Sequence, residues 1–249
     1  MIRLDNKIAW ITGAAGNIGR ALAIGFARRG AVIAASDITE DNSGLEAELQ
    51  AFNSNSFFCQ HDVTKPEDAN RVAAELQERF GHLDILINNA GIDPRKPAGE
   101  IEDQDWSRVL DTNLSGAWYT AQAALPLLMR SECGKIIQVG SITAHTGFKH
   151  MAHYVSSKMG LEGMTRGLAR DLGEHGIRVN CLVLGAVSGE RESELGSPEE
   201  IEATVSHHQS IAGRILPEDV ESVFAFFASP DSEAITGQSI RVDLGWTYG

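Results

Sequence analysis

The feature that most constrains this fold is a regular alternation of short apolar runs with longer amphipathic stretches. Most of the runs are apolar at consecutive positions, as strands are when helices cover both faces of their sheet. Seven such runs occupy residues 7–12, 31–36, 56–60, 84–88, 135–140, 177–184 and 239–243. Five stretches repeat apolar residues at i, i+3 and i+4, as helices do, at 17–30, 66–81, 115–130, 151–176 and 217–230.

This alternation predicts a doubly wound parallel sheet of the Rossmann type, an α/β fold with about seven strands flanked by helices. In such a sheet each strand leads into a right-handed crossover helix that covers one face or the other. The chain has 249 residues, of which 43% are hydrophobic, and this is enough for one large core. We expect residues 1–249 to form a single domain, since no linker or fixed repeat divides the sequence.

One stretch, residues 185–216, departs from the alternation because it is polar and shows no strand pattern. It follows the sixth predicted strand, and open α/β sheets bind ligands outside the carboxyl ends of their strands. We therefore expect a substrate lid here. The alternative is a surface excursion with no part in binding.

The composition excludes several classes of partner. The chain has 34 Asp and Glu against 21 Lys and Arg, a net charge of −13, whereas nucleic-acid binding needs clustered cations. No segment approaches the roughly 18 apolar residues of a membrane span, and no apolar signal segment follows the N-terminus. Cys59, Cys133 and Cys181 are far apart and odd in number, which favours reduced thiols. We expect a cytoplasmic protein that acts on a small molecule.

The first predicted strand leads into the helix through the stretch TGAAGNIGR, residues 12–20. Glycines at 13, 16 and 19 allow a ligand to approach the backbone, and the start of the helix offers unpaired N–H groups and a positive dipole end. Asn17 also stands in this turn, and asparagine enters the left-handed region more easily than most residues. The stretch favours a pyrophosphate cradle held partly by a left-handed Asn17, rather than a bare turn.

The second predicted strand ends at Asp37, eighteen residues after Gly19. A carboxylate at this strand end accepts hydrogen bonds from both ribose hydroxyls of a dinucleotide and repels a 2′-phosphate. The next residue is Ile38, so no arginine follows to bind such a phosphate. The sequence therefore predicts NAD as the cofactor.

The strongest chemical signal is the pair Tyr154 and Lys158, which share one face of a helix at i and i+4. Ser141 ends the preceding strand. A tyrosine has an ordinary pKa near 10, and a neighbouring ammonium lowers it by stabilising the phenolate. Tyr154 then exchanges a proton while the Ser141 hydroxyl holds the substrate oxygen. Taken alone, the spacing also fits a solvated helix pair.

These motifs occur in an order that resembles the short-chain dehydrogenase/reductase family. The matching pieces cover nearly the whole chain: Thr12-Gly13 with Gly19, Asp62-Val63, Asn88-Asn89-Ala90-Gly91, Asn113, Ser141, Tyr154 with Lys158, GIRVN, and ITGQSIRVD near the end. The resemblance implies a single-domain Rossmann fold, hydride transfer between NAD or NADP and a carbon that bears oxygen, and a homotetramer.

The resemblance also implies a role for each matching residue. Tyr154 is the general acid and base, Ser141 orients the substrate oxygen, Lys158 binds the nicotinamide ribose, and Asn113 supports a water that links Lys158 to solvent. Asp62 and Val63 flank the adenine, and residues 89–91 pass behind the cofactor. The full set of expected cofactor contacts is Gly13, Gly16, Asn17, Ile18, Gly19, Asp37, Asp62, Val63, Asn89, Ala90, Gly91, Tyr154, Lys158, Gly185 and Val187.

The chain departs from the family's pattern at four places near the expected cofactor. Asn17 replaces the middle glycine of the first turn, and Leu184-Gly185 replaces Pro-Gly. Gly189 stands where a threonine often contacts the carboxamide, and Leu244 replaces the first glycine of the terminal Asp-Gly-Gly. No catalytic group is lost, so these changes bear on the nicotinamide contacts and on the lid.

The substrate is less well specified than the cofactor. Arg95 and Lys96 follow the fourth strand and are candidates to bind an anionic group, although a solvated loop is the favoured alternative. Other candidates for the pocket wall are Thr143, His145, Met151 and His153. A sugar or polyol is the leading expectation. The alternatives are a 3-oxoacyl thioester reductase and a catalytically silent protein that senses the cofactor.

A metal site is not expected. His145, His150 and His153 lie close in sequence, and His207 and His208 follow later, but no cysteine or carboxylate partner accompanies them. A zinc site usually needs three or four placed ligands. These histidines are expected in the pocket wall or on the surface.

Overall fold

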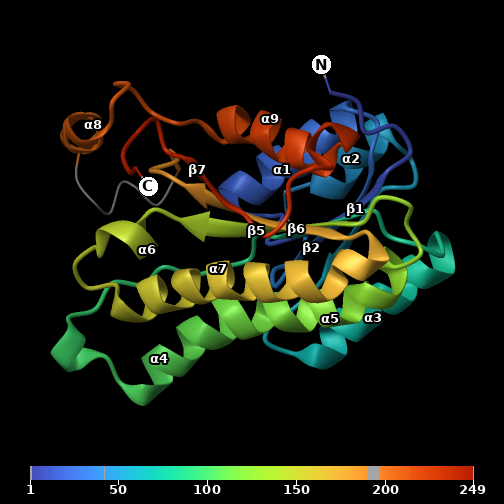
Figure 1. The fold of residues 1–249 in the computed structure, drawn as a ribbon, viewed down its shortest axis with the longest axis horizontal. Coiled ribbons are helices and arrows are strands. Elements are labelled where there is room, and N and C mark those ends of the chain that lie inside the picture. Colours follow the sequence, from blue (N-terminus) through green and yellow to red (C-terminus); the bar gives the residue numbers. More distant parts are fainter. Residues whose placement is uncertain (1, 42, 190–196, 249) are drawn as a thin grey trace.

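The computed structural model describes residues 2–41, 43–189 and 197–248. Its centre is one parallel sheet of seven strands in the order β3-β2-β1-β4-β5-β6-β7 (Figure 1). The order reverses between β1 and β4, where the crossovers change sides of the sheet. The strands are β1 Ile8–Thr12, β2 Val32–Asp37, β3 Phe57–Gln60, β4 Ile85–Asn88, β5 Lys135–Ser141, β6 Arg178–Leu184 and β7 Ser239–Val242.

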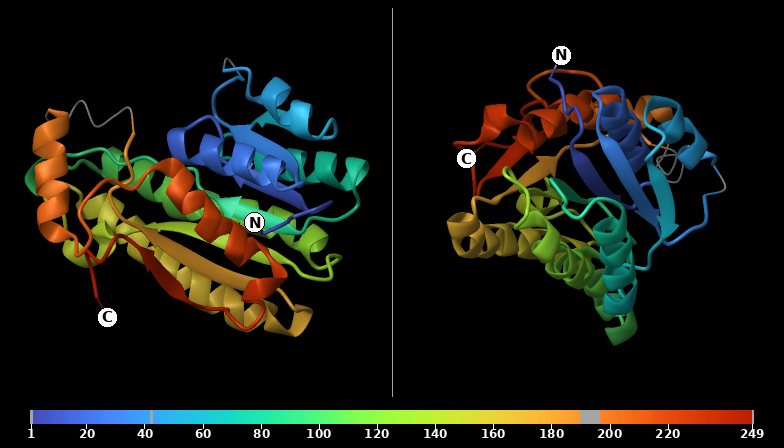
Figure 2. Two further views of the ribbon diagram at one scale, coloured as in Figure 1. Left: turned by 90° about the horizontal axis from the view of Figure 1, so that it is seen from above. Right: turned by 90° about the vertical axis from the view of Figure 1, so that its right-hand side faces the viewer.

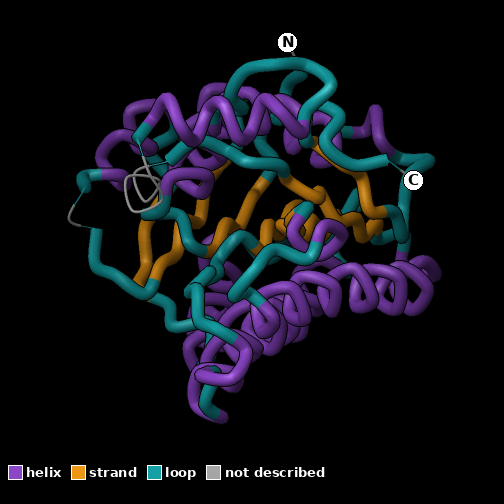
Figure 3. Tube along the Cα trace, turned by 90° about the vertical axis from the view of Figure 1, so that its left-hand side faces the viewer, coloured by secondary structure: helices purple, strands orange, loops and turns teal. Residues whose placement is uncertain are grey.

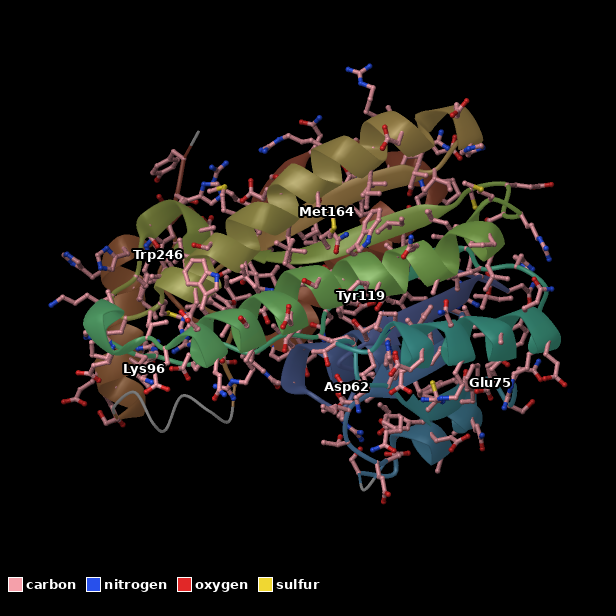
Figure 4. All side chains as sticks on the ribbon, turned by 90° about the horizontal axis from the view of Figure 1, so that it is seen from below. Asp62, Glu75, Lys96, Tyr119, Met164 and Trp246 are labelled. Carbon is pink, nitrogen blue, oxygen red and sulfur yellow. The ribbon has the colours of Figure 1, made fainter. Side chains whose placement is uncertain are left out.

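Helices cover both faces of the sheet (Figure 2). One face carries α1 and α9, with α2 beside them, and the other carries α3, α5 and α7, which lie side by side in Figure 4 with Glu75, Tyr119 and Met164 labelled. The helices are α1 Asn17–Arg28, α2 Leu45–Phe52, α3 Pro66–Arg79, α4 Asp103–Leu110, α5 Gly116–Leu128, α6 Thr143–Thr146, α7 Ala152–Leu172, α8 Pro198–His208 and α9 Pro217–Ala228.

Two apolar cores result, one on each side of the sheet. Successive side chains of a strand point to opposite faces, so Trp10 packs towards α3 and α5 while Ile11 packs towards α1 and α9. Both side chains are fully buried. This explains why the strands are apolar at consecutive positions, and it confirms the predicted doubly wound sheet with its seven strands and five main helices.

The sequence patterns missed the shorter helices. The structure adds α2, α4, α6 and α8, of which α4 and α8 start with capping boxes, Glu102 with Asp105 and Ser197 with Glu200. Each of these helices has 4 to 11 residues, so it presents few turns in which an i, i+3, i+4 pattern can be recognised. A π-helical segment, Asp111–Ser115, joins α4 to α5 in one nearly continuous helix.

The expected lid, residues 185–216, is only partly described, because residues 190–196 lie outside the described residues. Its described part contains α8 and a bridge between Val187 and Ile215. No strand occurs in that described part, although this isolated bridge does. A role as a substrate lid stays a prediction.

All seven strands point the same way, so their carboxyl ends meet at one edge of the sheet. Figure 3 looks onto this edge, where loops cross in front of the strand ends between the two helix layers. Within the described residues, no helix is both long and apolar enough to cross a membrane.

Candidate active site

The turn after β1 is shaped by close backbone contacts. Gly13 has a φ of +65°, and a Cβ there would lie 2.8 Å from the Cα of Ala90. A Cβ on Gly19 would lie 2.1 Å from the Gly13 carbonyl oxygen, so only glycine allows α1 to pack this tightly. Gly16 is different because, among the described residues, the one atom within 4 Å of such a Cβ is that same oxygen at 3.4 Å. Gly16 therefore faces the open side, where a phosphate group would approach the start of α1.

Thr12 and Asn89 join this turn to the end of β4. The Asn89 side-chain amide donates to the carbonyls of Thr12 and Gly13 at 2.9 and 3.0 Å. The Thr12 hydroxyl accepts from the backbone N–H groups of Asn89 and Ala90, both at 3.1 Å. Asn89 thus supports the turn through its side chain. Thr12 belonged to the sequence motif but not to the expected site, and its role here is to position the turn.

Asn17 does not adopt the left-handed conformation that the sequence analysis expected. It is the first residue of α1, after an extended Gly16, and the left-handed residue of the turn is Gly13. Asn17 therefore takes helical backbone angles as part of the first turn of α1. Its side-chain amide instead donates to the Ser188 carbonyl at 2.5 Å. Ile18, the next residue, packs against the α1 side of the core.

Asp37 lies at the end of β2 beside the same turn. Its carboxylate accepts from the Ala15 N–H at 3.1 Å and from the N–H and hydroxyl of Thr39, both at 3.0 Å. A carboxylate offers about four acceptor positions, so room for a ribose hydroxyl remains. Ile38, which follows, is 61% exposed and brings no charge. Contact between Asp37 and a ribose stays a prediction.

Asp62 and Val63 follow β3 on the same edge. The Asp62 carboxylate accepts from the N–H and hydroxyl of Thr64 at 3.0 and 2.7 Å. Partial burial by itself would raise the pKa of Asp62, but the hydrogen bonds from Thr64 and Lys65 outweigh it and lower that pKa. Val63 is buried and would touch a Cβ on Gly116. Contact with an adenine stays a prediction for both residues.

The structure brings Tyr154 and Lys158 together on α7. The Lys158 ammonium lies 5.6 Å from the centre of the Tyr154 ring and donates to the Val139 carbonyl at 2.8 Å. Ser141 ends β5, and its hydroxyl lies 2.9 Å from that of Thr143. The predicted i, i+4 geometry of the Tyr–Lys pair is thus present, next to the end of β5.

Burial governs the charge of Lys158. Its residue is only 4% exposed, and this desolvation lowers its pKa from 10.5 to about 8, against smaller opposing effects of Cys181 and Asp93. A lysine in this state holds its proton at neutral pH and releases it readily above pH 8. Such an ammonium stabilises a neighbouring phenolate.

Asn113 lies in the π-helical segment and ties the loop after β4 to α7. Its Oδ1 accepts from the Ile92 N–H at 2.8 Å, and its Nδ2 donates to the Ile92 carbonyl at 2.9 Å and the Ser157 hydroxyl at 3.1 Å. The Ser157 hydroxyl in turn donates to the Tyr154 carbonyl at 2.7 Å. Sequence reasoning missed Ser157; its place at i+3 from Tyr154 was the only available signal.

Gly91 lies where Asn113 and Lys158 approach each other. A Cβ there would be 3.3 Å from the Asn113 Oδ1 and 3.6 Å from the Lys158 Nζ. The two polar side chains therefore flank the same piece of backbone. The expected water between Asn113 and Lys158 stays a prediction.

Four of the expected substrate residues lie on α6 or at the start of α7. Thr143 lies beside Ser141, as noted above, whereas His145 contacts Glu162 at 2.6 Å and Arg241 at 3.4 Å through its two ring nitrogens. Met151 and His153 are 3% and 0% exposed, and burial lowers the pKa of His153. Their place in the pocket wall stays a prediction.

The loop after β4 presents one paired and one exposed cation. Lys96 forms an ion pair with Asp105 at 2.5 Å, so its charge is already balanced. Arg95 is exposed. Within the described residues, no group of three or more His, Cys, Asp or Glu side chains is arranged to hold a metal ion.

The ends of β6 and β7 carry two further departures from the family's pattern, Leu184 and Leu244. Gly185 packs so closely on Asp243 that a Cβ would lie 2.8 Å from its Cα. Leu244 has a φ of +52°, a conformation that glycine adopts at lower cost. Asp243 holds this tail by accepting hydrogen bonds from the N–H groups of Gly245 and Thr247.

These features are those of a nicotinamide-dependent oxidoreductase. The chain belongs to the short-chain dehydrogenase/reductase family. A family model described as enoyl-(acyl carrier protein) reductase matches residues 13–247.

Two curated relatives and one solved structure match almost the whole chain. D-xylose 1-dehydrogenase of Caulobacter vibrioides is 37% identical over 98% of this chain and 96% of its own. The 3-oxoacyl-[acyl-carrier-protein] reductase of Vibrio cholerae is 33% identical over 98% of each chain. A structure from Beutenbergia cavernae, described as an NAD(P)-dependent gluconate 5-dehydrogenase with NADP at low occupancy, has a TM-score of 0.91 and 31% identity over 98% of each chain.

The lowered pKa of Lys158 predicts a pH-dependent stability. Between pH 8 and about 10.5 the folded chain has released this proton and the unfolded chain has not, so raising the pH favours the folded state. Relative to Lys158→Met, the wild type should gain about 3 kcal/mol of unfolding free energy across this window. Urea unfolding at several pH values measures the difference.

Lys149→Met, at an exposed lysine, is the matched control. The difference in unfolding free energy between this variant and the wild type should stay constant over the same pH window. If the difference in unfolding free energy between Lys158→Met and the wild type also stays constant over this window, Lys158 is not desolvated as described.

Proposed function

We propose that this protein oxidises a sugar or a related polyol at a carbon that bears a hydroxyl group, with NAD as the hydride acceptor and Tyr154 as the general base. The observation that carries the proposal is the buried Lys158 ammonium beside the Tyr154 ring. The relative named D-xylose 1-dehydrogenase supports a sugar substrate.

The residues present fit a nicotinamide dinucleotide. The exposed Gly16 and the first N–H groups of α1 suit a pyrophosphate, and Asp37 suits a ribose diol. When bound, this cofactor supplies the hydride acceptor. Gly91, whose backbone lies against Asn113 and Lys158, suits close passage of the nicotinamide half.

Within this site, side chains of the protein take up one proton from the substrate. The Ser141 hydroxyl holds the substrate oxygen, and Tyr154 accepts the hydroxyl proton as the carbon–hydrogen bond breaks. The Lys158 ammonium stabilises the phenolate form of Tyr154 that accepts this proton. Asn113 and Ser157 fix the start of α7 and hence the position of Tyr154.

A 3-oxoacyl thioester reductase is the second candidate, favoured by the Vibrio cholerae relative. A silent cofactor sensor is disfavoured because Ser141, Tyr154, Lys158 and Asn113 are all present. A panel of D-xylose, D-gluconate, other polyols and a 3-oxoacyl thioester, followed by NADH absorbance, separates the three. Gluconate also tests whether exposed Arg95 favours an anionic substrate.

Tyr154→Phe should abolish most turnover because it removes the ionisable hydroxyl. The rest of the side chain is unchanged. Acid–base steps contribute about 10²–10⁴-fold, so kcat on the best substrate should fall by that factor while NADH affinity changes little. Tyr119→Phe, on the outer side of α5, is the matched control and should retain activity (Figure 4). Near-normal turnover of Tyr154→Phe would reject the assigned base.

NAD should be preferred over NADP by about a hundredfold or more, equivalent to roughly 3 kcal/mol. The Asp37 carboxylate has an acceptor position for a ribose hydroxyl in NAD and faces a like charge in NADP, and Ile38 offers no compensating cation. Asp37→Ala with Ile38→Arg should shrink or reverse the preference, measured as kcat/KM for each cofactor.

The single variant Ile38→Arg shows how much of the change in cofactor preference comes from the added cation and how much from the lost carboxylate. Equal kcat/KM values for both cofactors in the wild type would show that Asp37 does not face the ribose.

The protein is further proposed to be a cytoplasmic homotetramer. Large apolar side chains are exposed on the helical face opposite α1: Trp106, Trp118 and Met159 are 40%, 40% and 42% exposed. Apolar surface of this kind is typical of an interface between subunits. Light scattering on the purified protein should give four times the 26.9 kDa chain mass, and Trp118→Glu should lower it. A wild-type mass of one chain would contradict the assembly.

A further inference from the structure

Two departures from the family's pattern, Asn17 and Gly189, lie directly against each other. A Cβ on Gly189 would lie 2.9 Å from the Nδ2 of Asn17 and 3.6 Å from its Cγ. A side chain at residue 189 and the amide of Asn17 would therefore compete for the same volume. The two substitutions are complementary, since the larger residue at 17 requires the smallest residue at 189.

The Asn17 amide reaches a fixed part of the chain. It donates to the Ser188 carbonyl at 2.5 Å. Ser188 in turn donates its N–H to the carbonyl of Ile215 at 2.8 Å, and Val187 bridges to the same residue, which is 3% exposed. The contact thus joins the start of α1 to a segment anchored in the core.

The amide also sits where an anion is favoured. Asn17 is the first residue of α1, so its side chain lies beside the unpaired N–H groups and the positive end of the helix dipole. One of its two amide hydrogens goes to Ser188. Within the described residues the second has no protein acceptor, and both Asn17 and Gly16 are exposed on this side.

We propose that Asn17 is a cofactor-positioning residue that donates one N–H to the Ser188 carbonyl and the other to the diphosphate of the dinucleotide. This inference rests on the proposed function, because it assumes that a dinucleotide occupies the turn.

The test compares ligands with and without a diphosphate. Asn17→Ala should weaken NADH and ADP-ribose binding about tenfold or more, because a hydrogen bond to a charged group is lost. Adenosine affinity should stay unchanged, as should the thermal midpoint to within a few degrees. Asn70→Ala, an exposed asparagine on α3, is the matched control and should change none of these values.

A double-mutant cycle tests the pairing of residues 17 and 189. Gly189→Thr alone should weaken NADH binding because its side chain meets Asn17. Adding Asn17→Gly should recover part of the lost affinity, so that the two effects are not additive. Additive losses would overturn the proposed complementarity.

The outcomes separate this inference from the proposed function. A wild type that binds no NADH by fluorescence titration contradicts the proposed function itself. A wild type that binds NADH, with Asn17→Ala binding it equally well, overturns only the role of Asn17. Equal losses for ADP-ribose and adenosine would show a purely structural contact and would also overturn it.

Discussion

The close backbone approach between the turn after β1 and the end of β4 is the constraint on which the rest of the structure depends. Any side chain at Gly19 would collide with the Gly13 carbonyl, and any at Gly13 with Ala90. Because this contact holds, α1 starts in the crevice where the strand order reverses, which is where open α/β sheets bind ligands. The glycines at 13 and 19 are therefore packing requirements first, and the proposed phosphate site depends on them.

A second constraint lies at Lys158, beside Tyr154, where the burial of the side chain opposes its positive charge. An isolated buried ammonium is costly, and the Val139 carbonyl offsets only part of that cost. The lysine keeps its proton at neutral pH while its pKa is lowered to about 8. The Asn113–Ser157–Tyr154 hydrogen bonds hold the helix that carries it, so the tyrosine and the ammonium stay together.

Much of the fold was predictable because it follows from local periodicity. Short apolar runs identified all seven strands, and i, i+3, i+4 spacing identified the long helices. The short α2 and α4 escaped because eight residues make only about two turns, too few for the i, i+3, i+4 pattern to be recognised. Asn17 was misjudged because asparagine's tolerance of left-handed backbone is only a tendency, and here Gly13 takes the left-handed conformation while Asn17 is the first residue of α1.

The sequence by itself determined the order of elements, the Tyr154–Lys158 pair and the position of Asp37 at a strand end, since each depends on neighbours within one element. Only the tertiary structure decided which side chains meet across the crevice. The Asn17–Ser188 contact joins residues 171 apart, Lys96 is paired with Asp105, and His145 contacts Glu162 and Arg241. Such contacts depend on how loops from different strands pack at one edge, and no local spacing in the chain encodes that packing.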